Sequence, residues 1–529
     1  MNPSATRAGT LDRRTFLRGA GVSVAAAMGA GVVGPGAVGA TTRRAGPRLE
    51  GDPFALGVAS GDPSADGFVL WTRLTQGTAS GGGMPAAEVP VRWMVSSDEG
   101  MRTIVARDTV TARPDRAHAV HVVVTRLSPD RPYWYRFVVG DDETPVARTR
   151  TLPASDARPR RLDFGFASCQ NFCDGYYGAW GDVASDDDLD LVVFLGDYIY
   201  ESGLGGAVRA HDIPEVVTLE QYRNRYALYR SDPHLRAAHA CAPWLVTWDD
   251  HEVDNNYQGS TPEASSPTQG DAFPARRAAA YRAWWEHMPT RLAPPNGPDL
   301  RIFRRADFGR LARFHVLDTR QYRSNEPCAP ASVIGPVCDA ARAPEITVLG
   351  AEQERWLDRG LATSRAVWDV IAQQVVFSAF AFTPGAEGIR NLDQWDGYPE
   401  ARRRVLRSLR RHDVRNPVVI TGDVHASFVG DIPADFERPG SARIGTEFVG
   451  TSISSSGSPL LGSVLPTLLA NSPALRWGEV SQRGWVRCTV TPEEWRADYR
   501  TVADARVDGS PVTTSRSWVA ERDRPVEAA

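Results

Sequence analysis

Residues 191–201 read LVVFLGDYIYE, and this stretch indicates the fold of the larger part of the chain. Its first five residues are all apolar, which is typical of a strand covered on both faces. Gly196 and Asp197 follow without a gap. Layered α/β folds hold their functional side chains just beyond the carboxyl ends of such strands. The stretch therefore predicts an α/β domain with Asp197 in a site at the edge of a sheet.

Three further segments repeat this arrangement of an apolar run followed by potential metal ligands. They are FASCQN at 166–171, TWDDHE at 247–252 and TGDVH at 421–425. Each alone has an ordinary explanation, because Gly-Asp is common in turns, aspartate caps helices and a lone cysteine packs as a small apolar residue. Together they bring thiol, carboxylate and imidazole groups, which are the donors that bind Fe, Ca, Mn or Zn. The combination predicts a multinuclear metal centre.

The order of these segments resembles that of the calcineurin-like metallophosphatase superfamily. Where that superfamily has Gly-Asp, Asn-His-Glu, Gly-His-x-His and Asp-x-His, this chain has Gly196-Asp197-x-x-Tyr200, Asp250-His251-Glu252, Gly422-Asp423-Val424-His425 and Cys169-Gln170-Asn171. The departures match the narrower PhoD family of secreted alkaline phosphatases and phosphodiesterases. Further stretches similar to that family are GVASGDP at 57–63, VLWTR at 69–73, LDTR at 317–320, WDGY at 395–398 and FVGTS at 448–452.

The resemblance implies a ferric iron, Fe(III), with calcium ions, Ca(II), rather than a pair of zinc ions. The implied ligands are Cys169, Asp197, Tyr200, Asp250, Asp423 and His425, with Asn171 and Asp249 as further oxygen donors. Thiolate and phenolate are anionic donors that stabilise trivalent iron. Aspartate at two positions where the superfamily has Asn and His favours a hard cation such as Ca²⁺.

The implied reaction is hydrolysis of phosphate monoesters, with diesters as a second class, by attack of a metal-activated hydroxide on phosphorus. His251 corresponds to the histidine beside the leaving group, and it is either a general acid or a hydrogen-bonding neighbour of the ligands. Arg320 either binds phosphate through its planar fork or pairs with a nearby carboxylate. Asp318 is expected to orient its neighbours rather than bind metal.

The chain is expected to divide into four parts. Residues 12–18 read DRRTFLR and an uncharged Ala/Gly-rich stretch follows, so residues 1–40 resemble a twin-arginine export signal. Short β-rich runs separated by turns predict a fibronectin-III/Ig-like β-sandwich at 50–153. An α-β-β-α metallophosphatase domain is expected at 160–500, and a polar tail at 505–529. The signal implies a secreted, periplasmic or cell-wall protein that meets the twin-arginine export machinery and keeps no membrane span after cleavage.

Composition narrows the function classes. Hydrophobic residues make up 42% and charged residues 23%, and the net charge is −4, so nothing indicates sequence-specific nucleic-acid binding. The six cysteines include no CxxC pair, which argues against a zinc ribbon. Cys328 and Cys338 flank a short loop and are expected to form a disulfide, as suits an exported protein. No GxxxxGK loop for nucleotide phosphates is present.

Two alternatives to a phosphatase stay open at this point. The first keeps the site and changes the substrate, giving a phosphodiesterase or a phospholipase D of the same family. The second is a non-catalytic exported binding protein that uses its β-sandwich for adhesion. Convergent carboxylates without a cation would repel one another, which argues against the second alternative.

Overall fold

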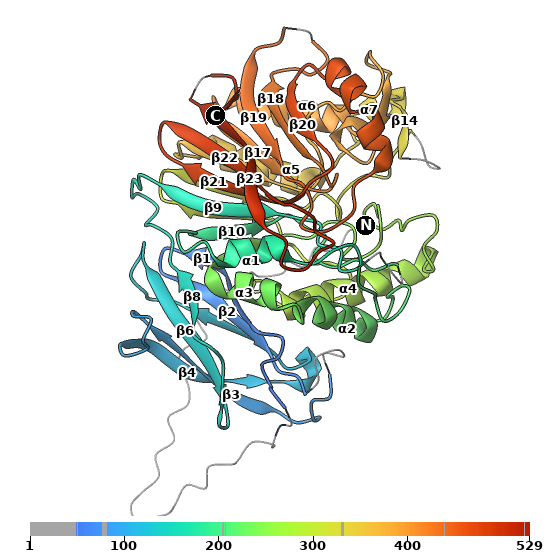
Figure 1. The fold of residues 1–529 in the computed structure, drawn as a ribbon. Coiled ribbons are helices and arrows are strands. Elements are labelled where there is room, and N and C mark those ends of the chain that lie inside the picture. The colour runs from blue at the N-terminus through green and yellow to red at the C-terminus, as the bar shows by residue number, and fades with distance from the viewer. Residues whose placement is uncertain are drawn as a thin grey trace, which may run out of the picture. The chain divides into compact units, whose positions relative to one another are not determined.

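Two large β-sheets organise the computed structural model (Figure 1), which describes residues 49, 51–76, 82–203, 206, 208–328, 333–438, 440–522 and 524–529. The expected export signal at 1–40 lies outside the described residues. In the first sheet, ten described strands are ordered β24-β23-β22-β21-β9-β10-β11-β1-β2-β5. Their bounds are β1 Val58–Ser64, β2 Gly67–Arg73, β5 Ala119–Val124, β9 Leu162–Ala167, β10 Leu191–Phe194, β11 Pro243–Val246, β21 Arg483–Val490, β22 Glu494–Val502, β23 Val512–Glu521 and β24 Glu527–Ala528.

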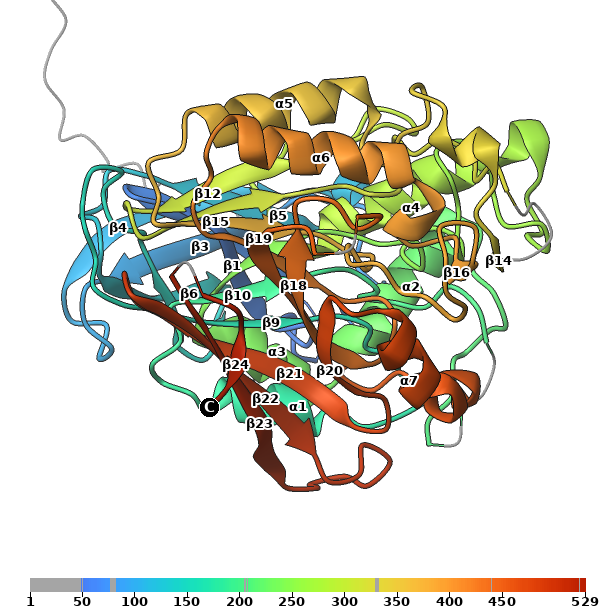
Figure 2. The ribbon, with the colours of Figure 1, turned by 90° about the horizontal axis from the view of Figure 1, so that it is seen from above.

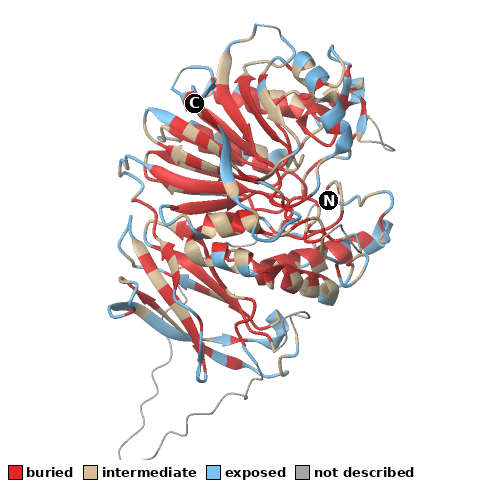
Figure 3. Ribbon diagram, in the orientation of Figure 1, coloured by how far each residue is buried: buried red, intermediate tan, exposed pale blue. Residues whose placement is uncertain are grey.

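The second sheet has seven described strands in the order β12-β13-β15-β17-β19-β18-β20. Their bounds are β12 Arg304–Phe308, β13 Ala312–Val316, β15 Trp368–Ala372, β17 Pro417–Thr421, β18 Ser427–Pro433, β19 Arg443–Val449 and β20 Leu475–Glu479. The inward residues of the two sheets share one apolar core, which includes Phe164 of the first sheet and Phe314 of the second. Figure 3 shows these central strands as almost entirely buried, which explains their uninterrupted apolar runs.

Helices cover the outer face of each sheet (Figure 2). Against the first sheet pack α1 Gly178–Ala184, α2 Leu219–Arg230, α3 Pro233–Cys241 and α4 Phe273–His287. Against the second pack α5 Gly350–Ala362 and α6 Pro399–Arg411. A further helix, α7 Pro459–Asn471, packs beside β18 and β20. Among the described residues, no helix combines the length and the apolarity that crossing a membrane requires.

The N-terminal strands form a sandwich that is joined to the rest of the chain. A smaller sheet contains β3 Val89–Ser96, β4 Ile104–Ala112, β6 Pro132–Val139, β7 Asp142–Glu143 and β8 Ala147–Arg150. It packs against β2 and β5 around an apolar core that includes Phe68 and Tyr135. The other face of this sandwich is no separate sheet, because β1 runs parallel to β11, with Ser60 opposite Pro243. Local sequence patterns do not reveal a pairing between segments so far apart along the chain.

The prediction of a polar tail at 505–529 is wrong. Residues in this segment form β23 and β24, and β23 pairs antiparallel with β22 at the edge of the first sheet. Trp518 and Ala520 belong to the apolar core between the sheets, while residues 513–516 and Glu521 are exposed. A strand near the edge of a sheet can carry a long exposed polar stretch, so its composition resembles that of a tail.

Candidate metal centre

The four segments singled out in the sequence meet where the two sheets approach each other. β9, β10 and β11 are adjacent and parallel, so Cys169, Asp197 and Asp250 follow neighbouring strand ends. β17 of the second sheet delivers Asp423 and His425. The loops are tied to one another, since the backbone N–H of Cys169 donates to the carbonyl of Gly196 over 3.0 Å. The fold therefore holds all four segments at one place.

Their side chains form a continuous set of potential ligands. Three groups have donor atoms within 4.8 Å of one another, namely Cys169, Asp197 and His425; Asp197, Asp250 and His251; and Asp249, Asp250 and Asp423. Asp197 belongs to the first two groups and Asp250 to the last two, so the groups are linked. The Tyr200 hydroxyl lies 3.1 Å from Asp197 Oδ2 and 3.0 Å from His425 Nε2. This arrangement suits more than one cation.

Several of these positions have an unusual backbone. Cys169, Asp197, Asp423 and His425 have φ values of 58°, 58°, 66° and 52°, in the left-handed region that L-residues avoid. Such strain is often found at functional sites, where the surrounding structure enforces it. Gly196 has a φ of 112°, and a Cβ there would lie 2.5 Å from the Asp249 nitrogen. Only glycine lets the two ligand loops approach this closely.

The buried Glu252 carboxylate holds two of these loops in place. Its Oε1 accepts from the Tyr198 backbone N–H over 2.7 Å. Its Oε2 accepts from the backbone N–H groups of Asp197 and Asp249 over 3.0 and 2.8 Å. Burial raises the pKa of Glu252 to about 7 despite these hydrogen bonds. One side chain thus satisfies three buried donors on the loops that follow β10 and β11.

Burial, together with the negative charge of neighbouring carboxylates, raises the pKa values of several candidate ligands. Burial raises the pKa of Asp197 well above its usual range, and it raises that of Asp423 to about 7. Burial also raises the pKa values of the Cys169 thiol and the Tyr200 phenol, and the charge of Asp197 acts in the same direction. Each of these groups becomes easier to ionise beside a cation, since a cation stabilises the anionic form.

Two buried carboxylate oxygens are available to bind cations. Among the described residues, Asp249 Oδ2 and Asp250 Oδ1 accept no hydrogen bond. Asp250 Oδ1 lies 3.6 Å from an Arg320 nitrogen, which is beyond hydrogen-bonding distance. Buried carboxylate oxygens without a hydrogen bond are costly unless an ion occupies their lone pairs. The residues present therefore fit a metal cluster with oxygen donors on one side and thiol, phenol and imidazole donors on the other.

Arg320 is fully buried and pairs with carboxylates instead of facing the cavity. It forms ion pairs with Asp249, with Asp393 over 2.7 Å and with Asp423 over 3.2 Å. Asp249 and the other carboxylates raise the pKa of Arg320 well above its usual value, although burial acts against them. Of the two roles left open for Arg320, the structure supports the ion pair, and we do not retain phosphate binding by this residue.

His251 is oriented by a residue that the sequence did not single out. The Glu201 carboxylate lies 2.7 Å from His251 Nδ1, and the His251 ring stacks on Tyr200 with centroids 4.1 Å apart. Glu201 is itself buried and accepts from the Asn255 backbone N–H over 2.9 Å. Burial lowers the pKa of His251, but Glu201 and Asp197 outweigh it and raise that pKa well above the usual range. Glu201 therefore fixes the orientation of the His251 ring at the site.

Two other predicted residues have structural contacts. Asn171 Oδ1 accepts from the Cys173 backbone N–H over 3.0 Å, and Asn171 Nδ2 donates to Asp174 over 3.3 Å. These contacts hold the Asn171 side chain in place, and its expected role as a ligand stays a prediction. Asp318 Oδ1 accepts from the backbone N–H groups of Arg320 and Gln321 over 3.0 Å each, which is the orienting role expected for it.

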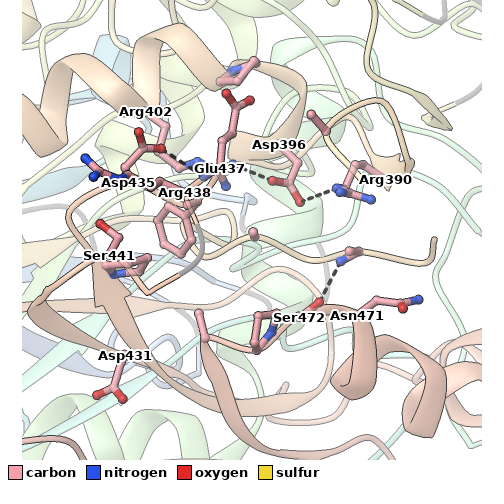
Figure 4. Close-up of a pocket in the computed structure, with 18 of the residues that line it drawn as sticks. Arg390, Asp396, Arg402, Asp431, Asp435, Glu437, Arg438, Ser441, Asn471 and Ser472 are labelled. Atoms are coloured by element: carbon pink, nitrogen blue, oxygen red, sulfur yellow. Dashed lines mark hydrogen bonds and ion pairs between the residues drawn. The ribbon is translucent and has the colours of Figure 1, made fainter. Parts of the chain in front are cut away.

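A cavity of about 320 Å³ opens over the ligand groups and is lined by Asp197, Asp250, His251, Asp423 and His425. A larger cavity of about 500 Å³ lies elsewhere, between α6, α7 and the β18–β19 connection (Figure 4). Its charged residues neutralise one another, as Asp396 pairs with Arg402 over 2.7 Å. None of the three ligand groups lines it, so the smaller cavity is the candidate active site.

Comparison with known proteins identifies the family. Residues 164–499 match the family model described as PhoD-like phosphatase, and residues 40–153 match the model of its N-terminal domain. The chain belongs to the PhoD-like phosphatase family. Alkaline phosphatase D of Bacillus subtilis (strain 168) is 46% identical over 523 residues, which cover 97% of this chain and 88% of the relative. A solved structure described as PhoD superposes with a TM-score of 0.87 and 45% identity, covering 91% of this chain and 93% of that one.

These comparisons confirm the PhoD-like phosphatase family and the enzyme class that were expected from the sequence. The chain is a phosphoric ester hydrolase, and the alternative of a non-catalytic binding protein is not retained. A metal-dependent reaction agrees with the three ligand groups. Among the residues of this PhoD-like phosphatase that sequence reasoning missed are Glu201, Asp393 and Ser455, whose hydroxyl donates to the Tyr200 hydroxyl over 2.8 Å.

Proposed function

We propose that this chain is an alkaline phosphatase that releases phosphate from small-molecule monoesters and accepts diesters as a second class. The observation that carries the proposal is the linked set of ligand groups at the floor of an open cavity. Cys169, Asp197, Tyr200 and His425 would hold iron, because thiolate and phenolate suit its trivalent state. Asp249, Asp250 and Asp423 would hold calcium, because they offer only oxygen. Asn171 is a further candidate oxygen donor.

Bound cations supply Lewis-acid polarisation of the phosphoryl oxygens and a more acidic water. The protein's part is to position groups around the ester. Glu201 binds His251 Nδ1, which fixes the ring so that Nε2 faces the cavity and can donate a proton to the departing alkoxide. Arg320 neutralises part of the charge of Asp249 and Asp423 and so reduces the repulsion between the two carboxylates. Gln394 Nε2 donates a hydrogen bond to Asp423 Oδ2 over 2.7 Å and so orients the Asp423 carboxylate.

Export by the twin-arginine route to the cell surface or medium is part of the proposal. It rests on DRRTFLR at 12–18 and on the uncharged stretch that follows. The disulfide between Cys328 and Cys338 suits an oxidising compartment. Replacement of Arg13 and Arg14 by Lys should leave the protein inside the cell, and undiminished export of that variant would contradict the route.

The test of the catalytic proposal is hydrolysis of p-nitrophenyl phosphate and of bis-p-nitrophenyl phosphate by the purified mature protein, with the metal content of the same sample measured. Faster cleavage of the monoester at alkaline pH, lost to chelator and restored by calcium, is the expected result. Faster cleavage of the diester would move the assignment to a phosphodiesterase or phospholipase D while keeping the site. Metal-loaded protein that cleaves neither ester would refute the proposal.

A further inference from the structure

The cavity over the ligand groups has an apolar side that the chemistry at its floor does not use. Besides the candidate ligands and polar residues such as Asn255 and Asn391, it is lined by Phe380, Phe382, Val424, Leu460 and Leu461. Val333 and Ile334, beside and within the short strand β14 Ile334–Pro336, add a second apolar stretch. A phosphoryl group is polar and charged, so it gains nothing from contact with these side chains. The apolar lining needs another explanation.

This apolar side is rigidly built. Phe380 and Leu461 are buried in the core between α7 and β18, and Phe382 and Val424 pack against that core. Phe380 meets Phe382 edge to face, with centroids 5.9 Å apart and planes at 85°. Phe380 meets Phe428 in the same way at 5.0 Å and 86°. Rings fixed like this offer a preformed surface, so a ligand does not have to order it.

The outer part of the lining is open to solvent. Leu460, at the start of α7, is 58% exposed, and Ile334 is 37% exposed. β14 is held by antiparallel pairing with β16 Ile389–Asn391 and by the disulfide between Cys328 and Cys338. Apolar side chains gathered at the mouth of a pocket, above a few convergent polar groups, are typical of a ligand site. The cavity volume of about 320 Å³ lies in the range of such sites and leaves room beyond a phosphoryl group.

We propose that Phe382, Leu460 and their neighbours form a subsite for the apolar substituent of the phosphate ester. The inference rests on the proposed function, because it takes the phosphoryl group to lie on the ligand groups. The substituent then extends along the side of the same cavity, where Phe382 and Leu460 cover it. The enzyme consequently prefers esters of alkyl or aryl alcohols to esters of polyols of the same size.

The experiment uses a series of alkyl phosphates from methyl to hexyl, together with glycerol phosphate as the polar match of the butyl ester. The alcohols of the alkyl series are nearly equal in acidity, so differences in kcat/KM report contact rather than leaving-group reactivity. We expect kcat/KM to rise at least about tenfold from methyl to hexyl, since even one added methylene in an apolar pocket is worth about tenfold. Alkyl p-nitrophenyl diesters carrying the same chains extend the comparison to diesters.

Variants assign the effect to the subsite. Phe382→Ser and Leu460→Ser should each lower kcat/KM about tenfold for hexyl phosphate and less than about twofold for methyl phosphate. Phe382→Leu should keep most of the chain-length dependence, because it keeps an apolar surface. Val123→Ser is the matched control, as Val123 is 51% exposed on β5 and does not line the cavity.

The outcomes separate the two proposals. A chain-length dependence that the serine variants flatten supports the subsite. Hydrolysis of every ester with equal efficiency, or a chain-length dependence unchanged in Phe382→Ser and Leu460→Ser, overturns the subsite and leaves the phosphatase intact. No hydrolysis of any ester by metal-loaded protein overturns the proposed function and the subsite with it.

Discussion

Replacement of Glu252 by Gln tests how the ligand loops are held. The wild-type carboxylate accepts three hydrogen bonds from backbone N–H groups, of Tyr198, Asp197 and Asp249, at 2.7 to 3.0 Å. The amide oxygen of Gln can accept the two that share Oε2. Its amino group must then face the N–H of Tyr198, so one donor opposes another in a site that water does not reach.

The expected cost follows from those contacts. One charge-assisted hydrogen bond is lost and leaves a buried N–H unsatisfied, which costs about 2 to 3 kcal/mol. The two remaining bonds change from charged to neutral acceptors and lose about 1 kcal/mol together. We therefore expect Glu252→Gln to lower the free energy of unfolding by about 3 to 4 kcal/mol. It should also lower the iron and calcium content, because the loops bearing Asp197 and Asp249 lose their common anchor.

Glu447→Gln provides the control. Glu447 is equally buried and accepts from the backbone N–H groups of Phe377 and Ser378 and from the Thr421 hydroxyl, over 2.7 to 2.8 Å. Its loss should destabilise the fold to a similar degree but lower metal binding less, since neither backbone donor carries a ligand and only the Thr421 hydroxyl adjoins a ligand segment. Unfolding in urea and metal analysis of both variants form the assay. Equal metal content in the two variants at equal loss of stability would show that Glu252 supports the fold and not the ligand loops.

Three further predictions concern separate parts of the molecule. Cys169→Ser should stay folded but contain less iron, because the proposed thiolate ligand is removed. Unchanged iron content would remove Cys169 from the ligands. Glu201→Gln should lower kcat about a hundredfold or more with little change in KM, because it weakens the orientation of His251 for proton transfer; an equal rise in KM would point to binding instead. Burial holds the pKa values of His239 and His287 well below 6.5, so both stay neutral in the folded state while the unfolded chain takes up protons. The free energy of unfolding then decreases as pH falls below about 6.5, by about 1.4 kcal/mol per pH unit for each histidine. Urea unfolding of His287→Gln should show a pH dependence smaller by the contribution of one histidine.

The candidate ligands could be predicted from the sequence because their signal is local. Asp197, Asp250 and Asp423 each follow an apolar run that is typical of a buried strand, and parallel strands bring such ends together. The departures at 250 and 423 also carried the family resemblance. Each apolar run and the ligands that follow it lie within a few residues, so no knowledge of tertiary contacts was needed to find them.

The parts that sequence reasoning missed depend on contacts between distant segments. Nothing near Arg320 in the sequence shows that Asp249 and Asp393 will surround it, so ion pairing and phosphate binding were indistinguishable. Glu201 stands inside the motif that contains Asp197, yet its partner His251 is fifty residues further along the chain. The parallel pairing of β1 with β11 joins the N-terminal sandwich to the first sheet. It could not be predicted for the same reason, because the two strands are far apart along the chain.

Backbone strain and charge at the site support a single physical interpretation. Left-handed backbone at Cys169, Asp197, Asp423 and His425 costs about 1 to 2 kcal/mol per residue. The carboxylates of Asp249, Asp250 and Asp423 converge on one fully buried guanidinium, that of Arg320, which cannot neutralise all of them. Both costs fall on the folded state without cations, whereas cations that bind only the folded state stabilise it. The same residues that place the ligands for catalysis therefore couple the stability of the fold to metal binding, so removal of the metals should lower stability as well as activity.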